Sequence, residues 1–247
     1  MCDSGHAPIR AMPSTYVSGM EYKGTQSFEG KWSGTGFYPE ETLQYFDYFF
    51  KGKQAEHTGY MPNELLLTTL TTNSPDIKVL DLERRNFDSE TMGAIMGCVL
   101  GNTHVTELKI ARNVSFWSEQ PDDFGLALAA VLGEKTSAVT TVDIKNNDIH
   151  EEAIAAIMES LKTNTKVTWL DMSDNFSRGQ GAAIGAMLKE NTTLTYLNLN
   201  VNQLTDEDAG HVLAGVEANK QLKYFSAYNN GAVSAATRKA LRGFNKL

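Results

Sequence analysis

Apolar positions return at a nearly constant spacing through most of this chain. A representative stretch is Val167-Thr-Trp-Leu170-Asp-Met172, which is apolar at its first, fourth and sixth positions. Five further stretches share this pattern and begin at Ile77, Val105, Val139, Leu194 and Leu222. Alternate residues of a strand point to the same side, so the fourth and sixth positions predict the buried face of a short strand.

A polar position follows each stretch at a fixed offset. Five of the six stretches have asparagine three residues after the sixth position, and Arg85 occupies this slot in the first. The asparagines are Asn113, Asn147, Asn175, Asn202 and Asn230, and the slots are 28, 34, 28, 27 and 28 residues apart. An inward-turned asparagine can satisfy backbone groups that would otherwise be buried unpaired. This fixed period predicts leucine-rich repeats.

The stretches are separated by segments with helical spacing. Three of these segments cover Glu152–Lys162, Gly181–Lys189 and Asp208–Glu217. Similar patterns predict helices at Glu40–Phe50, Glu64–Thr72 and Ser234–Phe244. A second set of asparagines precedes the first apolar residue of a strand by three positions: Asn102, Asn164, Asn191 and Asn219. Asparagine tolerates the left-handed conformation that often ends a helix, so we expect that conformation at these positions.

These patterns predict an α/β fold, a leucine-rich-repeat horseshoe with parallel strands on its concave face and helices on its convex face. The 28-residue period with a full helix resembles the ribonuclease-inhibitor-like class of repeats. The joints Leu161-Lys-Thr-Asn-Thr-Lys-Val167 and Leu188-Lys-Glu-Asn-Thr-Thr-Leu194, and the opening Asn73-Ser-Pro-Asp-Ile77, are similar to the repeat domain of tropomodulins and leiomodins. The resemblance covers residues 62–247 and implies a cytoskeletal setting, either actin-linked or ciliary.

We expect three regions along the chain: an aromatic-rich N-terminal extension at 1–38, a helical cap at 39–73, and about six repeats with a C-terminal capping helix at 74–247. Residues 1–60 hold 12 of the 23 aromatic side chains. Disordered tails are poor in aromatics. Two interpretations remain open, because these rings can pack on the flank of the solenoid or dock on a partner.

Composition narrows the choice of partner and compartment. The formal net charge of −8 argues against a nucleic acid or an anionic membrane as the main partner. No apolar run approaches the roughly 20 residues that span a bilayer. The only cysteines are Cys2 and Cys98, which form no disulfide framework and favour a reducing, cytoplasmic location.

The concave face supplies the main candidate binding site. In the column just before the fourth position, Trp169, Tyr196 and Tyr224 lie on successive strands and predict a contiguous aromatic ladder. The next column places Asp143 and Asp171 beside the ladder. Large rings rimmed by polar groups are typical of binding hot spots. The alternative is that the rings stack on one another and only stabilise the sheet.

Further aromatic residues extend this candidate site. Tyr228 adds a phenol at the edge of the ladder. The second repeat is six residues longer than the others, and its extra length carries Phe116 and Trp117. Insertions of this kind often map to the binding face of a solenoid. These two rings anchor a partner or fold back over the gap that the insertion opens.

Motifs for catalysis or cofactor binding are incomplete. The run Gly179-Gln-Gly181-Ala-Ala-Ile-Gly185 has its third glycine one place late for a dinucleotide fingerprint. His150-Glu151-Glu152 lacks the second histidine of a zinc helix. We therefore expect no cofactor, no metal site and no enzyme activity.

The sequence favours a non-catalytic protein-interaction module that is a structural or scaffolding subunit of a larger assembly. The alternative is a regulator of another enzyme, such as a small GTPase or a nuclease. Ribonuclease inhibitor and the Ran GTPase-activating proteins share this repeat class, and Arg84 and Arg85 are the candidates for such a role.

Overall fold

A computed structural model describes residues 20–21, 27–28, 64–114 and 122–243 of the chain. Six short strands form one parallel sheet, and their order in the sheet is their order in the chain. They are β3 (Val79–Asp81), β4 (Glu107–Lys109), β5 (Thr141–Asp143), β6 (Trp169–Asp171), β7 (Tyr196–Asn198) and β8 (Tyr224–Ser226). A separate antiparallel pair joins β1 (Met20–Glu21) to β2 (Ser27–Phe28). The predicted leucine-rich-repeat solenoid is therefore confirmed.

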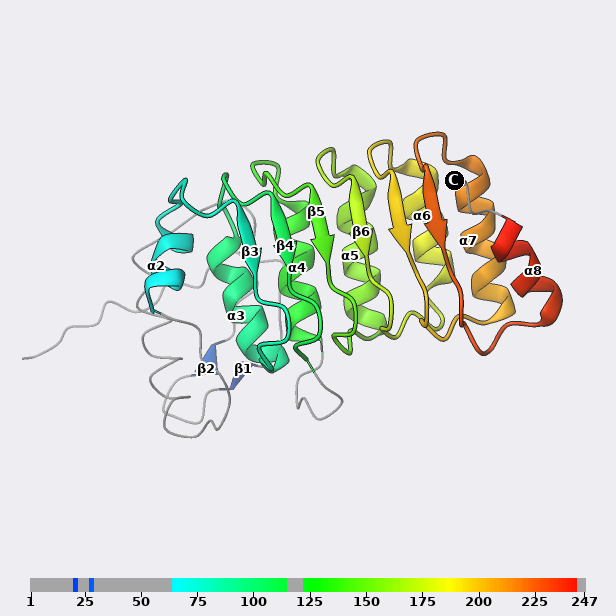
Figure 1. The fold of residues 1–247 in the computed structure, drawn as a ribbon, viewed down its shortest axis with the longest axis horizontal. Coiled ribbons are helices and arrows are strands. Elements are labelled where there is room, and N and C mark those ends of the chain that lie inside the picture. The colour runs from blue at the N-terminus through cyan, green and yellow to red at the C-terminus, as the bar shows by residue number, and fades with distance from the viewer. Residues whose placement is uncertain (1–19, 22–26, 29–63, 115–121, 244–247) are drawn as a thin grey trace, which may run out of the picture.

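A helix follows each strand and lies on one side of the sheet, as Figure 1 shows. The helices are α2 (Glu64–Thr71), α3 (Ser89–Val99), α4 (Asp123–Gly133), α5 (Glu151–Thr163), α6 (Gly181–Glu190), α7 (Asp206–Ala218) and α8 (Ala235–Gly243). The five predicted helices at 64–72, 152–162, 181–189, 208–217 and 234–244 match α2, α5, α6, α7 and α8. The predicted helix at Glu40–Phe50 and the extension at 1–38 lie outside the described residues, apart from β1 and β2.

The core lies between the sheet and the helices. One inward residue of each strand is in register with its neighbours and has an exposed fraction of at most 2%: Leu80, Leu108, Val142, Leu170, Leu197 and Phe225. Alternation along each strand therefore sends the flanking residues to the concave side, as the sequence pattern predicted.

The asparagine that follows a strand is buried and joins neighbouring repeats. Asn147 donates Nδ2 to the carbonyl of Ile110 at 2.9 Å and to that of Ile144 at 3.1 Å. Its Oδ1 accepts the backbone N–H of Asn113 at 2.9 Å. The amide thus pairs backbone groups of two repeats that would otherwise be buried without a partner, which confirms the predicted role.

The asparagines at the helix ends do not adopt the left-handed conformation that we expected. Asn164, Asn191 and Asn219 have φ between −67° and −72° and are extended. The side chain explains the difference. Nδ2 of Asn164 donates to the carbonyl of Leu132 in the preceding repeat at 2.7 Å, and its Oδ1 accepts the N–H groups of Lys166 and Val167 at 2.8 Å. The asparagine thus closes the helix end through its amide rather than through its backbone.

Asn73, two residues after α2, is left-handed with φ of 53°, and so are Asn86, Asp148 and Gln203. Six further left-handed residues lie immediately before the slot that follows each strand. They are Arg84, Arg112, Asn146, Asp174, Val201 and Asn229, with φ between 54° and 60°. Asparagine and aspartate tolerate this region, but it is strained for a β-branched residue. Val201 is therefore the costly member of the set, and it is also one of the few large apolar side chains that are well exposed, at 40%.

Candidate protein-binding face

The three predicted ladder rings stack on the concave face. Register pairs Trp169 with Tyr196 and Tyr196 with Tyr224. The ring centroids of Trp169 and Tyr196 are 4.7 Å apart and those of Tyr196 and Tyr224 are 4.4 Å apart, with interplanar angles of 15° and 4°. These separations match the spacing of neighbouring strands, about 4.8 Å, so the register itself positions the rings. All three side chains are half-buried.

The environment of the ladder keeps the phenol of Tyr196 neutral. Partial burial, together with the charge of Asp171 and the neighbouring Tyr224, raises the pKa of Tyr196 to about 12. A hydrogen bond between the side chains of Tyr196 and Tyr224 contributes to the same shift. The central ring of the ladder is therefore uncharged at physiological pH.

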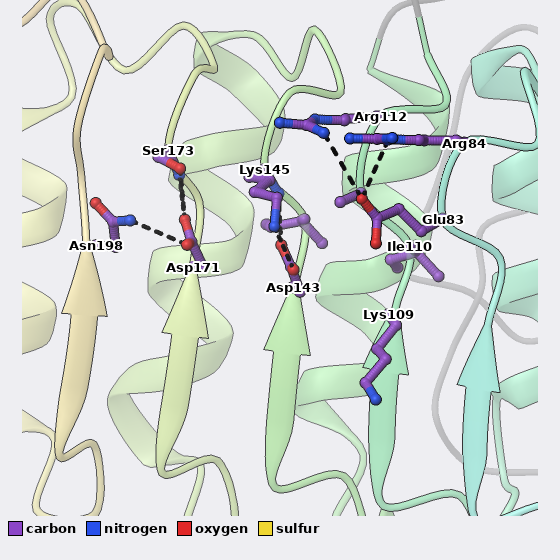
Figure 2. A network of polar contacts seen from close by, with 12 residues as sticks. Glu83, Arg84, Lys109, Ile110, Arg112, Asp143, Lys145, Asp171, Ser173 and Asn198 are labelled. Carbon is purple, nitrogen blue, oxygen red and sulfur yellow. Dashed lines mark hydrogen bonds and ion pairs between the residues drawn. The ribbon is translucent and has the colours of Figure 1, made fainter.

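The two predicted acids beside the ladder already have partners within the chain. Asp171 is buried, and its carboxylate accepts hydrogen bonds from the hydroxyl of Ser173 at 2.6 Å and from Nδ2 of Asn198 at 2.9 Å. Asp143 pairs with Nζ of Lys145 at 3.0 Å. Figure 2 shows both carboxylates at the ends of their strands. Asp171 therefore orders the strand end beside the ladder, while Asp143 lies on a more open part of the face.

Of the other predicted site residues, Tyr228 is among the residues that the structure describes. Tyr228 is half-buried, and its backbone N–H donates to Oδ1 of Asn200. The carbonyl of Tyr228 accepts the N–H of Val201 at 2.9 Å, so the exposed Val201 lies in the loop next to it. Phe116 and Trp117 lie outside the described residues.

The first repeats of the concave face also carry a charged group that was not predicted from the sequence. Glu83 lies 3.4 Å from Nε of Arg84 and 3.9 Å from Nη1 of Arg112 (Figure 2). Lys109 pairs with Glu107 at 3.4 Å. The repeat spacing carried a signal for this group. Arg84 and Arg112 are 28 residues apart and occupy the same position of successive repeats, so an alignment of the repeats places them side by side.

A hollow of about 540 Å³ separates the charged group from the ladder. Its lining residues are Asp81, Glu83, Glu107, Lys109, Thr141, Asp143 and Trp169. Thr141 is in register with Trp169 and is much smaller than the indole ring. The ladder therefore ends at an open, mainly acidic depression rather than at another ring.

The glycines that resemble a nucleotide fingerprint serve the packing of two repeats. The N–H groups of Gly179 and Gly181 donate to the carboxylate of Asp208 at 3.1 and 2.9 Å. A Cβ on Gly181 would lie 2.2 Å from Cα of Asp208, so a side chain does not fit there. The N–H groups that would cradle a phosphate thus bind a carboxylate of the next helix.

Neither a metal cluster nor a membrane-spanning helix is present among the residues that the structure describes. Within them, no three or more histidine, cysteine, aspartate or glutamate side chains gather as a metal site would require. No helix within 64–114 or 122–243 has both the length and the apolar character to cross a membrane.

The parallel register, the buried asparagine of successive turns and the outer row of helices define a leucine-rich-repeat solenoid. A model of the leucine-rich repeat family matches residues 190–210, from the end of α6 through β7 to the start of α7. Among curated proteins, none matches the chain.

Two solved structures are similar to this chain. A structure of the leiomodin-1 actin-binding site 2 is 17% identical, with a TM-score of 0.47, and the match covers 74% of this chain and 88% of that one. The tropomodulin C-terminal domain of Caenorhabditis elegans is 11% identical, with a TM-score of 0.43, and the match covers 73% and 89%.

Proposed function

We propose that this protein is a non-catalytic interaction module that binds a protein partner through its concave face, with Trp169, Tyr196 and Tyr224 as the anchor. It serves as a structural or scaffolding subunit of a larger cytoplasmic assembly, in a cytoskeletal or ciliary setting. The observation that carries the proposal is the stacked, half-buried aromatic ladder on the concave side of the sheet.

The geometry of the ladder favours binding because its rings are held in place before a partner arrives. Association costs free energy for each side chain that must be ordered, roughly 0.5–1.5 kcal/mol for a flexible one. Stacking and strand register already fix these rings, so little of that cost remains. Aromatic residues in such positions dominate the energetics of protein interfaces. A purely structural ladder has the same stacking, so binding has to be measured.

The surroundings of the ladder indicate the chemistry of the partner. Asp143 and the other acids of the hollow lie next to the indole of Trp169. An aromatic face beside carboxylates suits a cationic side chain, because both attract positive charge. A partner segment with apolar or aromatic residues over the ladder and a lysine or arginine in the hollow fits this face. The net charge of −8 also disfavours a nucleic acid as this partner.

Affinity purification from the native source tests the proposal. The intact chain is compared with the triple variant Trp169→Ala/Tyr196→Ala/Tyr224→Ala. A control carries Glu159→Ala/Lys162→Ala/Lys189→Ala, three substitutions of charged residues on the opposite, helical side. Circular dichroism establishes that both variants fold. We expect a specific partner to disappear with the ladder variant and to stay with the control.

A second variant separates ring shape from hydroxyl chemistry. Tyr196→Phe/Tyr224→Phe keeps the stacked rings, so it should retain most of the binding if the rings are the anchor. Retention of every partner by the folded ladder variant would show that the ladder is structural. Loss of the partner with both the ladder variant and the helical-side control would exclude the concave face as the specific determinant.

A further inference from the structure

Asn230 closes the last of the buried asparagine turns, and its exposed fraction is 2%. Its Oδ1 accepts the backbone N–H groups of Asn202 at 2.8 Å and Leu204 at 3.1 Å. Its Nδ2 donates to the carbonyls of Leu199 at 3.1 Å and Ala227 at 3.0 Å. One side-chain amide thus joins the loop after β7 to the loop after β8.

The residue that follows Asn230 sets it apart from the other asparagines of the chain. Asn230 precedes Gly231, and no other asparagine in the sequence precedes a glycine. The four asparagines at the equivalent positions precede larger residues: Val114, Asp148, Phe176 and Gln203. A glycine has no side chain, so its backbone nitrogen can approach neighbouring groups that a larger residue would block. Asn230 is therefore the asparagine whose side chain can react most readily with the main chain.

The reaction that such a pair undergoes is deamidation. The backbone nitrogen of Gly231 loses its proton to a base in the solvent and attacks Cγ of Asn230. The bond between Cγ and Nδ2 breaks, the nitrogen takes up a proton from water and leaves as ammonia, and a succinimide ring remains. Water then opens the ring at either carbonyl and yields aspartate or isoaspartate.

The native structure leaves one reacting group free and holds the other. Gly231 is exposed, and within 64–114 and 122–243 its N–H donates no hydrogen bond. The amide of Asn230 is buried and hydrogen-bonded to the preceding repeat. Cγ must turn toward Gly231 before it can be attacked, and this turn breaks those bonds. The last repeat must therefore open first, and the rate of deamidation follows the population of the open form.

We propose that Asn230 is a deamidation site controlled by opening of the C-terminal repeat, and that its conversion weakens the joint between the last two repeats. In the aspartate product an oxygen replaces Nδ2 next to the carbonyls of Leu199 and Ala227 and has no hydrogen to donate. Buried acceptors that lose their donor destabilise a fold. Isoaspartate also adds a methylene group to the main chain of the turn. The modified repeat is the one that carries Tyr224.

Helix α8 and the loop before it hold the last repeat closed, and Figure 1 shows α8 at the C-terminal end of the solenoid. Leu241 of α8 is 2% exposed. The N–H of Val233 donates to the carbonyl of Asn230 at 3.3 Å, and that of Ser234 donates to Asp206 of α7 at 2.8 Å. Each repeat of a solenoid contacts only its neighbours, so an end repeat can open while the others stay closed.

Ageing of the full chain at mildly alkaline pH tests the proposal, with peptide mapping by mass spectrometry as the measurement. In urea, Asn230 should convert faster than any other asparagine. In the native chain it should convert at least about a hundredfold more slowly, because opening must come first. Gly231→Ala should suppress the conversion in both conditions. This variant fits the structure, because Gly231 is not left-handed and a Cβ there has no atom within 4 Å. Equal rates for Asn230 in urea and in buffer would overturn the proposed control by opening.

Two truncated side chains distinguish opening of the last repeat from opening of the whole chain. Leu241→Ala in α8 and Leu128→Ala in α4 each remove a buried leucine side chain. Leu241→Ala should accelerate native deamidation at least about tenfold, whereas Leu128→Ala should change it less than about twofold. Circular dichroism verifies that both variants fold. Equal acceleration by the two variants, or none by Leu241→Ala, would refute a local opening.

A direct substitution tests the consequence of the conversion. Asn230→Asp should lower the midpoint of thermal unfolding by about 4 °C or more, because it removes the buried donor. The matched control is Asn229→Asp, since Asn229 is exposed and aspartate tolerates its left-handed conformation. The control should leave the midpoint unchanged. Equal midpoints for both variants would show that conversion of Asn230 does not weaken the joint.

Discussion

The concave face is largely charged in the first three strands and aromatic in the last three, whereas the helix layer behind the sheet is nearly uncharged in α3 and α4 and carries more charged residues in α5, α7 and α8. Glu90 and Asp123 are the only charged residues of α3 and α4. Helix α7 alone carries Asp206, Glu207 and Asp208 in its first turn. The same repeat pattern thus occurs with nearly uncharged helices in one part of the solenoid and with an aromatic concave face in another.

This difference shows which positions the fold requires. The inward residues of the strands and the buried asparagines are similar in both halves, because they form the core and close the turns. The outer helix positions and the concave columns vary independently of them. The C-terminal half therefore presents aromatic rings on its concave side. The N-terminal half instead has its nearly uncharged residues in helices α3 and α4.

The largest effect should come from the close helix packing of the C-terminal half. A Cβ on Gly185 would lie 2.4 Å from the carbonyl oxygen of His211, whereas one on Gly210 has no atom within 4 Å. Gly185→Ala should lower the free energy of unfolding by about 3 kcal/mol, because backbone must move. Gly210→Ala should raise it by up to about 1 kcal/mol through helix propensity. Urea unfolding measures both, and a neutral Gly185→Ala would refute the packing argument.

Acid should weaken the hydrogen bonds between α6 and α7, which a carboxylate accepts, and should leave the hydrogen bond between Ser89 of α3 and Phe124 of α4 unchanged. Burial alone would raise the pKa of Asp208, but hydrogen bonds from Thr205, Gly181 and Gly179 hold it below its ordinary value. The stabilisation is therefore present above the unfolded pKa and is lost as the pH falls through the lower, folded pKa. We expect Asp208→Asn to cost about 1.5 kcal/mol at pH 7, because an amide cannot accept all these bonds, and progressively less below pH 4.

A hydrogen bond between α3 and α4 in the N-terminal half involves no carboxylate. The hydroxyl of Ser89 accepts the N–H of Phe124 at 3.0 Å. Ser89→Ala should therefore cost about 1 kcal/mol at every pH. Thermal unfolding from pH 3 to pH 7 compares each variant with the unaltered chain. Equal pH dependence of the two differences would contradict the proposed contrast.

The stacked rings should be energetically coupled to each other. A double-mutant cycle of Tyr196→Ala and Tyr224→Ala should give a coupling of about 1 kcal/mol in unfolding experiments. Glu107 and Thr141 are also in register, in the same column of the N-terminal half, and are the control pair. Their cycle should give a coupling of less than about 0.3 kcal/mol. Equal couplings would mean that strand pairing, not ring stacking, is measured.

A gain in stability is expected at Val201. This residue is left-handed with φ of 57°, while Asn146, Asp174 and Asn229 occupy the same position in other repeats. Val201→Asn should raise the free energy of unfolding by about 1 kcal/mol because it removes the strain of a β-branched residue. Thermal unfolding tests this. A concurrent loss of partner binding would place Val201 in the binding face, whereas unchanged stability would show that its conformation is not strained.

The sequence predicted the strands, the buried asparagines and the alignment of the three rings, because these depend on a short local pattern repeated six times. It failed at the helix ends, where local propensity suggested a left-handed residue but the amide of Asn164 bonds to the preceding repeat. The group around Glu83 and the burial of Gly97 were also missed. The burial of Gly97 in α3 depends on which residues of distant segments meet, and a local pattern does not contain that information. The group around Glu83 could have been found, because Arg84 and Arg112 occupy the same position of successive repeats.

The buried asparagines also give the solenoid a direction. The N–H of Asn113 donates to the amide of Asn147, that of Asn147 to Asn175, and that of Asn202 to Asn230. In each case the earlier repeat is completed by a side chain that comes later in the chain. On a ribosome, where the N-terminus emerges first, a repeat would wait for its successor before its loop is fully bonded. The loop of each of these repeats is therefore fully hydrogen-bonded only after the next repeat has been synthesised.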